Sequence, residues 1–404
     1  MRIKRTLPPA AAPIEVQDLI SGLRGMLRGG ETLSKFEKEL KEYFEAEYCF
    51  AVSSGKAALT LVLEVLHQLR PEQNEVVIPA YTCYSVPSAV IRARLAIRLC
   101  DIEETTLDFD LNQLSRQLKS KKVLCVMPTH LFGVPANIRK LRELVGEKPI
   151  FIVEDAAQAM GAEWQGGKLG ALGDVGFFSM GRGKAFSTTE GGVIVTRDER
   201  IGQALQEKIR TLPAMRATGI VRTIGETIVL SVFMHPPLFW LPKALPFLKL
   251  GQTFYNPDFP IHRLSSFNAG TAARWQAKIE RFRKLRCRNI TALIESGILP
   301  PGPVGPQCPD LIRFPLITDM PERKRELLYH AERQGLGFSP GYPDSVAAIP
   351  ELADQHFPPE SFRVAKDVAA RLLTLPIHPL VNDQDLQKII GSVCPPLPLF
   401  NLSP

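Results

Sequence analysis

Short, continuous apolar runs alternate along this chain with longer segments in which apolar residues recur at a helical period. Such runs are typical of strands that are buried on both faces of a sheet, and helical connections between them are typical of parallel strands. The pattern therefore predicts an α/β protein, with strands at Cys49–Val52, Val76–Pro79, Leu95–Cys100, Val123–Met127, Pro149–Val153, Val175–Phe178, Val193–Thr196 and Ile312–Ile317.

Helices are predicted where apolar residues return every three or four positions. Near the N-terminus, Ile14 to Leu27 shows this period, Gly29-Gly30 breaks it, and Thr32 can cap a second helix. Residues 1–13, rich in proline and alanine, are predicted to form a mobile arm. Further helices are expected at Gly55–Leu69, Ile138–Val145, Glu199–Leu212, Ala272–Ser296 and Glu322–Gln334.

The segment from Met215 to Pro260 departs from this alternation. It contains a continuous apolar run, Ile228 to Met234, followed by a stretch with four prolines and Lys243. A membrane-spanning helix needs about 20 consecutive apolar residues, so the prolines and the lysine argue against one here. Two interpretations stay open: an apolar helical insertion packed on the body or at a dimer interface, which we favour, or a membrane-surface element or lid with peripheral membrane contact through residues 228–250.

Length and charge narrow the classes of protein. A chain of 404 residues exceeds the usual size of a single core. We therefore expect a large domain over residues 14–260, including the insertion at 215–260, and a linking helix with a small C-terminal domain over residues 261–404. The net charge of +7 has no dense lysine or arginine cluster behind it, so nucleic-acid binding is not expected, whereas anionic substrates are mildly favoured.

The cysteines give no sign of a disulfide framework. They are odd in number and scattered, and none forms a Cys-x-x-Cys pair, so neither a zinc site nor any other metal site is predicted. The basic N-terminus lacks the apolar core of a signal peptide. We therefore expect a reducing, cytoplasmic setting for all seven: Cys49, Cys83, Cys100, Cys125, Cys287, Cys308 and Cys394.

Reactive side chains follow two neighbouring apolar runs. Glu154 and Asp155 come directly after one predicted strand, and Ser179 and then Lys184 come after another. In open α/β sheets the ligand crevice lies at the carboxyl ends of the strands. A lysine amine and a carboxylate are what pyridoxal phosphate needs, for a Schiff base and for a protonated pyridine nitrogen. Each residue alone is explained as well by a helix cap or a surface cation.

The combined motifs resemble the DegT/DnrJ/EryC1/StrS aminotransferase family. The residues that carry the resemblance are EDAAQ at Glu154–Gln158, the FS of Phe178–Ser179, Lys184, and the EGG that ends at Gly192. The resemblance extends over roughly residues 14–392. It implies a fold-type I pyridoxal-phosphate enzyme, whose mostly parallel sheet is sandwiched by helices and followed by a smaller C-terminal α/β domain.

The same resemblance implies roles for individual residues. Lys184 would bind the cofactor and act as general base, and Asp155 would keep the pyridine ring protonated. The cofactor phosphate would be held by Ser179 and by the turn Ser54-Gly55-Lys56, where Lys56 replaces the usual threonine. Gln158 would lie beside the ring. The family's ring-stacking aromatic falls on Cys83 in this chain, so Tyr81 or Tyr84 is the substitute. His130 is expected near the site, and Gly337–Tyr342 and His378 near the substrate.

Function and partners follow from the resemblance as expectations. The chain would move an amino group from an amino acid, expected to be glutamate, to a keto sugar, expected to be nucleotide-linked, in polysaccharide or glycoconjugate synthesis. A homodimer is expected, although Ile261 occupies the slot of the asparagine that reaches the neighbouring subunit in the family. Two alternatives stay open: a sugar dehydratase, which Lys184 opposes because dehydratases carry histidine there, and a non-catalytic, regulatory relative.

Overall fold

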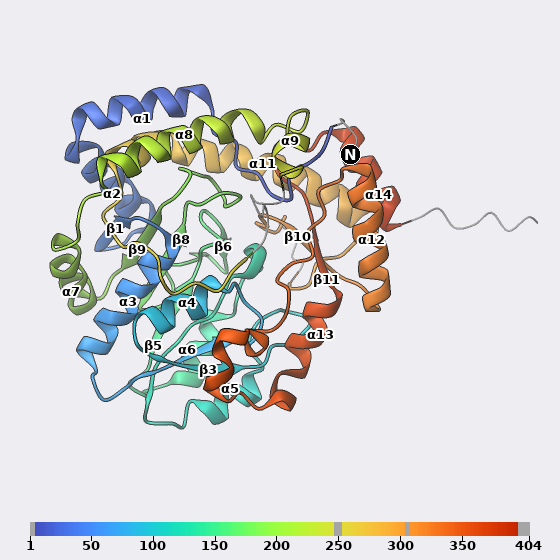
Figure 1. Ribbon diagram of the computed structural model, residues 1–404. Coiled ribbons are helices and arrows are strands. Elements are labelled where there is room, and N and C mark those ends of the chain that lie inside the picture. Colours follow the sequence, from blue (N-terminus) through green and yellow to red (C-terminus); the bar gives the residue numbers. More distant parts are fainter. Residues whose placement is uncertain (1–4, 246–252, 304–307, 395–404) are drawn as a thin grey trace, which may run out of the picture.

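The computed structural model describes residues 5–245, 253–303 and 308–394 (Figure 1). A large domain is built on a seven-stranded sheet in the order β1-β9-β8-β5-β4-β2-β3. Its strands are β1 (Tyr48–Val52), β2 (Glu75–Pro79), β3 (Ala96–Cys100), β4 (Val123–Val126), β5 (Phe151–Asp155), β8 (Val175–Ser179) and β9 (Gly192–Thr196).

Only β9 runs against the other strands of this sheet. It pairs antiparallel with both β1 and β8, whereas β8, β5, β4, β2 and β3 pair in parallel. A small ribbon of β6 (Glu163–Trp164) and β7 (Gly167–Lys168) lies in the connection between β5 and β8. The predicted mostly parallel sheet is confirmed, and its strands fall close to the apolar runs of the sequence.

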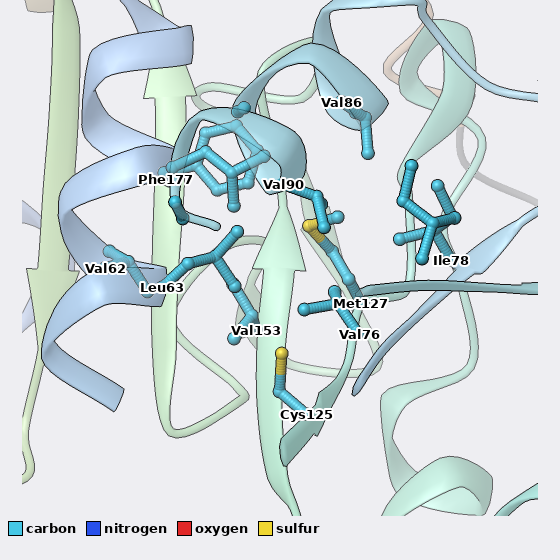
Figure 2. Packing of buried hydrophobic residues seen from close by; sticks show 14 of the residues in the cluster. Val62, Leu63, Val76, Ile78, Val86, Val90, Cys125, Met127, Val153 and Phe177 are labelled. Carbon is cyan, nitrogen blue, oxygen red and sulfur yellow. The ribbon is translucent and has the colours of Figure 1, made fainter. Parts of the chain in front are cut away.

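Helices cover both faces of the sheet because successive strand residues point to opposite sides. In β2, Val76 and Ile78 pack against one face while Val77 packs against the other. The first face carries α3 (Gly55–Leu69), α4 (Ser85–Arg92) and α7 (Glu199–Arg210), and Figure 2 shows Val62 and Leu63 of α3 meeting the sheet. The second face carries α2 (Gly30–Phe44), α5 (Leu111–Gln117), α6 (Ile138–Val145) and α10 (Ser266–Thr271).

The small domain follows the long linking helix α11 (Trp275–Glu295). Its two strands, β10 (Phe314–Ile317) and β11 (Leu372–Leu375), pair antiparallel and pack with helices in a separate core. The helices α12 (Pro321–Gln334) and α14 (Asp383–Val393) line this core, whereas the buried side chains of α13 (Arg363–Arg371) join the core of the large domain. Asp101, at the end of β3, accepts hydrogen bonds from the backbone N–H groups of Val364 and Ala365 at the start of α13, which ties the two domains together.

The N-terminal segment is packed rather than free from Arg5 onward. Leu7 and Ala10 are buried, and the carbonyl of Pro8 accepts a hydrogen bond from His378 Nε2 at 2.9 Å. Arg5 pairs with Asp385 of α14 at 2.6 Å. The mobility predicted for residues 1–13 is therefore replaced by packing at 5–13, because the alanines and leucine of this segment fill a seam beside the small domain. Residues 1–4 lie outside the described residues.

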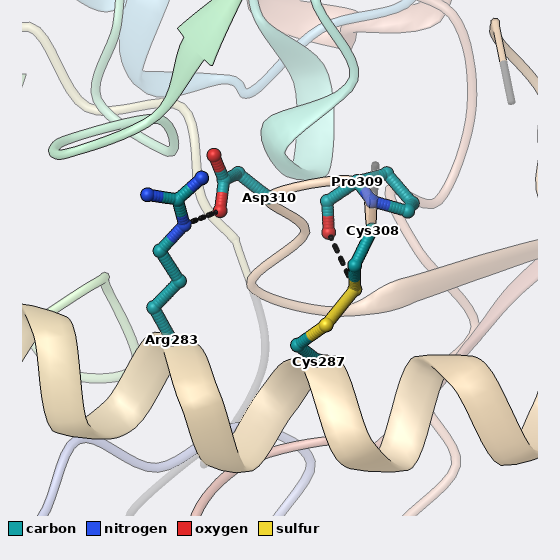
Figure 3. Close-up of a disulfide and its surroundings, with 5 residues drawn as sticks. All are labelled: Arg283, Cys287, Cys308, Pro309 and Asp310. Carbon is teal, nitrogen blue, oxygen red and sulfur yellow. Dashed lines mark hydrogen bonds and ion pairs between the residues drawn. A yellow bond between two sulfur atoms is a disulfide. The ribbon is translucent and has the colours of Figure 1, made fainter. Parts of the chain in front are cut away.

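One cysteine expectation is wrong. Cys287 of α11 and Cys308 form a disulfide beside the ion pair of Arg283 with Asp310 (Figure 3). The two cysteines are 21 residues apart in sequence, and no spacing motif marks them as a pair. Their pairing depends on the fold, which brings the segment before β10 back to the middle of α11.

In its described residues, the insertion forms two helices on the large domain. They are α8 (Ala217–Phe233) and the short α9 (Trp240–Lys243), and α8 contacts α1 (Val16–Arg28). Within the described residues, no helix combines the length and apolar content needed to cross a bilayer. The positions 246–250 of the predicted membrane contact fall outside the described residues.

Candidate active site

The carboxyl ends of β5 and β8 bring the predicted site residues together. Asp155 is the last residue of β5 and lies opposite Phe177 of β8 in the parallel register. The chain leaves β8 at Ser179 and turns through Gly183, whose φ of +69° favours glycine, so that Lys184 returns toward Asp155. The end of β5 thus positions the carboxylate, and an irregular loop with a glycine turn positions the lysine.

Asp155 is a buried carboxyl with few partners. Its side chain accepts a hydrogen bond from the Ala157 N–H at 3.0 Å and is 5% exposed. Burial raises the pKa of Asp155, while the Ala157 N–H and the positive charge of Lys184 oppose that rise. A cation bound next to this carboxyl therefore favours its ionised form.

Lys184 is a cation without a fixed partner. In the described part of the chain its amine makes no hydrogen bond or ion pair, although the side chain is only partly exposed. Burial lowers the pKa of Lys184, and Arg313 lowers it further, while Cys83 and Asp155 act in the opposite direction. A desolvated amine with a lowered pKa is a better nucleophile and proton acceptor than an exposed lysine.

Tyr342 and Arg313 of the small domain complete the cluster. Tyr342 Oη accepts a hydrogen bond from Gln158 Nε2 at 3.0 Å, and its ring stacks on Phe132 with centroids 6.2 Å apart. Burial raises the pKa of Tyr342, which keeps its hydroxyl neutral. Arg313 has a buried Nε that finds no acceptor among the described residues, and burial lowers its pKa.

The residues expected to stack on the cofactor ring divide into two groups. Tyr81 is buried, and its hydroxyl accepts a hydrogen bond from the Tyr342 N–H at 3.1 Å, so it joins the two domains. Tyr84 also joins them, because its hydroxyl donates to the Asp344 carbonyl at 3.3 Å. Cys83 is half-buried, and its Sγ lies 3.6 Å from the Thr253 hydroxyl oxygen. The hydroxyls of both tyrosines are thus used at the junction of the two domains.

A cradle for an anion lies where α3 begins. The first N–H groups of a helix have no helical acceptors, and Ser54 Oγ accepts only that of Ala57 at 3.1 Å. Space is tight around the backbone, because a Cβ on Gly55 would come within 2.9 Å of the Ser179 side chain. A Cβ on Gly192 would come within 2.2 Å of the Ser54 carbonyl. These residues fit a phosphate held by backbone N–H groups and hydroxyls.

Lys56 points elsewhere in this structure. Its amine lies 4.4 Å from the ring centroid of Phe259, a cation–π contact, and burial lowers its pKa. The predicted phosphate contact of Lys56 thus rests on its backbone N–H at the start of α3. Its side chain is positioned to hold Phe259 of the segment after the insertion.

A buried pair supports the strand that carries Asp155. His130 Nδ1 accepts from the Ala136 N–H at 3.0 Å, so Nε2 carries the proton and donates it to Glu154 at 2.9 Å. The two carboxylate oxygens of Glu154 also accept N–H groups of Gly170 and Leu172 in the loop before β8. The side chains of His130 and Glu154 are both fully buried. His130 therefore acts by holding the site together, and Glu154 fastens β5 to the approach to β8.

Sequence reasoning did not single out Arg313. No motif marks this residue, which precedes β10, and only the docking of the small domain places it beside Lys184. Phe132 lies in the motif Pro128–Gly133, of which only His130 was expected near the site. Tyr342 was included in the predicted stretch Gly337–Tyr342. His378, predicted near the substrate, is buried and bonded to the N-terminal segment, and burial lowers its pKa to about 4, so it is neutral near pH 7.

The sheet order, the strand-end carboxylate and the loop lysine define a fold-type I architecture. A family model described as the DegT/DnrJ/EryC1/StrS aminotransferase family matches residues 15–233 and 263–394. The chain therefore belongs to this aminotransferase family. The model has no match to residues 234–262, which include α9.

Relatives in this family include enzymes with different products. The chain is 30% identical over 205 residues to GDP-4-keto-6-deoxy-D-mannose 3-dehydratase of Yersinia pseudotuberculosis, covering 50% of each chain. It is 29% identical over 172 residues to GDP-perosamine synthase of Vibrio cholerae, covering 43% of this chain and 46% of the relative. The matches thus span about half the length of these curated relatives.

The fold is shared along the whole chain with solved structures. The Helicobacter pylori aminotransferase PseC, described as involved in the biosynthesis of pseudoaminic acid, superimposes with a TM-score of 0.77. The alignment covers 96% of this chain and 98% of that structure at 16% sequence identity. At this identity the likeness establishes the fold-type I architecture alone.

Proposed function

We propose that this protein is a pyridoxal-phosphate-dependent aminotransferase that moves an amino group from an amino acid, glutamate in the simplest case, to a keto sugar, expected to be nucleotide-linked. The observation that carries the proposal is the unpartnered Lys184 amine, with a lowered pKa, facing the buried Asp155. Family membership and relatives named for sugar amination support the choice of substrate. A homodimer, and a place in polysaccharide or glycoconjugate synthesis, belong to the same proposal.

Different residues of the chain would have different roles around the cofactor. When bound, pyridoxal phosphate supplies an aldehyde for the amine and an electron-withdrawing ring. Lys184 would bond that aldehyde, yield to the incoming amino donor, and then accept and return a proton at its Nζ. Asp155 would hold the ring nitrogen protonated. Ser179, Ser54 and the N–H groups of Gly55 and Lys56 would hold the phosphate, and Gln158 would lie beside the ring.

Arg313 supplies a place for a carboxylate. Its Nε is buried without an acceptor in the described chain, and it lies close enough to Lys184 to lower the lysine pKa. A guanidinium whose Nε is buried without an acceptor favours the binding of an anion, and a planar carboxylate fits its fork of donors. We propose that this anion is the carboxylate of the amino donor, because the phosphate cradle lies at the separate junction of β8 and α3.

The purified protein tests the proposal directly. Wild type and Lys184→Ala would be mixed with pyridoxal phosphate, and their visible absorption followed before and after L-glutamate is added. We expect wild type to show a band of lysine-bound cofactor that glutamate abolishes, whereas the variant shows neither the band nor the response. Lys119→Ala, at an exposed lysine after α5, is the matched control and should behave as wild type.

The alternatives give different outcomes in the same experiment. A non-catalytic relative would show the band but no response to any amino donor. A dehydratase is disfavoured because Lys184 stands where those enzymes carry histidine. The absence of any band with pyridoxal phosphate would overturn the proposed cofactor and the activity together.

A further inference from the structure

Most of the exposed large hydrophobic side chains in the described chain lie on one layer of helices. This layer, which we call the α1–α8–α9 surface, lies along one side of the molecule in Figure 1. Leu27 of α1 is 90% exposed and Val221 of α8 is 69% exposed. The other members are Val16, Ile20, Leu23, Met26, Ile228, Val229, Val232, Leu238, Leu241 and Leu245.

The outer apolar positions are not needed for packing of the helices on the protein. On α1 the inward face carries small residues, since a Cβ on Gly22 would come within 2.7 Å of Phe267 of α10. On α8 the inward face carries Thr223 and Thr227, both buried and hydrogen-bonded. Each helix therefore docks through small or polar residues and turns a second, apolar face to the outside.

The charges at this surface are predominantly positive. The acidic residues within α1 and α8 are Asp18, paired with Lys278 and Arg274, and Glu226, paired with Arg182 and Arg222. Arg24, Arg28 and Arg216 are exposed and have no acidic partner in the described part of the chain. The remaining cations of these helices are Arg222 and Lys243, each in an ion pair.

An apolar cavity opens at the same layer. It has a volume of about 530 Å³ and lies between the start of α1, the end of α8 and the linking helix. Its walls are mostly apolar, and they include Ile14, Val16, Val232, Phe282 and Leu380. A cavity of this size lies within the range of sites that hold a small ligand or a hydrocarbon segment, roughly 300–1,000 Å³.

We propose that the α1–α8–α9 surface binds the face of an anionic phospholipid bilayer, with the helices lying in the interface and none crossing it. Apolar side chains flanked by arginine are the signature of such interfacial helices, and cations near an anionic bilayer are attracted to its negative surface. A second copy of the chain fits less well, because the acidic residues of α1 and α8 are already paired within the chain and leave none free to meet Arg24, Arg28 and Arg216. The cavity gives lipid chains a recess that a flat protein surface would not fill.

Sedimentation of the full-length protein with vesicles tests this proposal. Neutral phosphatidylcholine vesicles and vesicles containing phosphatidylglycerol would be compared at low and at high salt. We expect binding to the anionic vesicles, at least tenfold weaker to neutral ones, and weakened by salt because charges at a surface are screened. The double variant Leu23→Glu/Val229→Glu should lose this binding, and Arg24→Glu/Arg28→Glu should lose its preference for anionic lipid.

Controls separate this inference from its rivals. Leu299→Glu removes a similarly exposed leucine on another part of the protein and should bind vesicles as wild type does. Failure of wild type to bind anionic vesicles would overturn the proposal. It would also be overturned if sedimentation velocity showed a dimer that Leu23→Glu/Val229→Glu dissociates, since the surface would then be an interface between copies. None of these outcomes depends on whether the protein transfers an amino group.

Discussion

The loop that carries Lys184 and the α1–α8–α9 surface lie next to each other, but they differ in which side chains they bury and which they expose. In the loop, polar groups are buried and partnered: Asn268 donates to the Thr188 carbonyl at 2.7 Å, and Thr189 and Thr227 share a hydrogen bond of 2.7 Å. On the surface, apolar side chains are exposed and uncovered. Helix α8 belongs to both, through its threonines inside and its valines outside.

The contrast shows where function departs from the needs of folding. Buried polar groups normally find partners, so the Lys184 amine and Arg313 Nε, which have none in the described chain, mark the site, together with the unpaired hydroxyls of Thr82 and Thr129. Soluble proteins rarely gather exposed apolar side chains into one contiguous layer, so the α1–α8–α9 surface stands out in the opposite way. Each exception marks a place where a ligand or a surface outside the chain is expected.

Removing the buried support of β5, the strand that ends at Asp155, gives the largest expected effect on stability. Glu154→Ala leaves His130 and three backbone N–H groups without their acceptor. Breaking a buried charged network in this way costs about 3–5 kcal/mol, measured as the free energy of unfolding in urea. Glu163→Ala, at an exposed position of β6, is the control and should change stability by less than about 0.5 kcal/mol.

The pair of Glu154 and His130 also makes the stability of the protein depend on pH. Burial alone would raise the pKa of Glu154, but the His130 hydrogen bond and the loop N–H groups outweigh it, and the net shift is downward. A carboxyl whose pKa is lower in the folded state contributes stability above its ordinary value of 4.5, and this is lost as the pH falls. We expect wild type to lose stability below pH 4.5 more steeply than Glu154→Gln. Equal slopes would contradict the assignment.

Arg313→Leu tests whether Arg313 serves the binding of the amino donor or the stability of the fold. We expect the KM for the amino donor to rise about 10–100-fold, since a hydrogen bond to a charged group is worth roughly 1.5–3 kcal/mol, with a smaller change in kcat. Stability should be unchanged or slightly higher, because Arg313 is half-buried, its Nε has no acceptor, and it makes no ion pair in the described chain. A loss of stability with an unchanged KM would show that Arg313 is structural.

Thr227→Val tests the junction between the two regions. Thr227 donates its only hydroxyl proton to the Thr223 carbonyl, so Thr189 must be the donor in the bond between them. Thr189 has a φ of +76°, a strained value for a threonine. Removing its acceptor leaves a buried hydroxyl unpaired, which costs about 1–3 kcal/mol. Ser231→Ala, on the exposed side of α8, removes a hydroxyl without this consequence and should be close to wild type.

The sequence predicts the sheet and the lysine–carboxylate pair because both are local. Apolar runs specify the strands directly, and Asp155 and Lys184 each follow a strand within a few residues, so the shared strand ends bring them together. The motif Glu154–Gln158 is continuous along the chain, so it can be recognised without the fold. Local pattern and global fold therefore agree in this region.

The remaining site residues depend on long-range docking. Arg313 and Tyr342 reach Lys184 only because the small domain closes on the large one, through contacts such as Tyr81 with Tyr342, which are 261 residues apart. The disulfide of Cys287 with Cys308 likewise depends on the path of the chain before β10. No period or motif encodes these contacts, so sequence reasoning could name candidates such as Tyr342 but not Arg313.

The smallest expected effect comes from the outer face of α8. Val229 is 52% exposed, so Val229→Ser removes little buried apolar area and should change the free energy of unfolding by less than about 0.5 kcal/mol. Thr227→Val, two residues away but inward, should cost more although it adds an apolar group. A loss above about 1 kcal/mol for Val229→Ser would show that this face is covered in the folded protein. If stability is unchanged, folding does not account for a valine at this position, and a contact outside the chain is the better explanation.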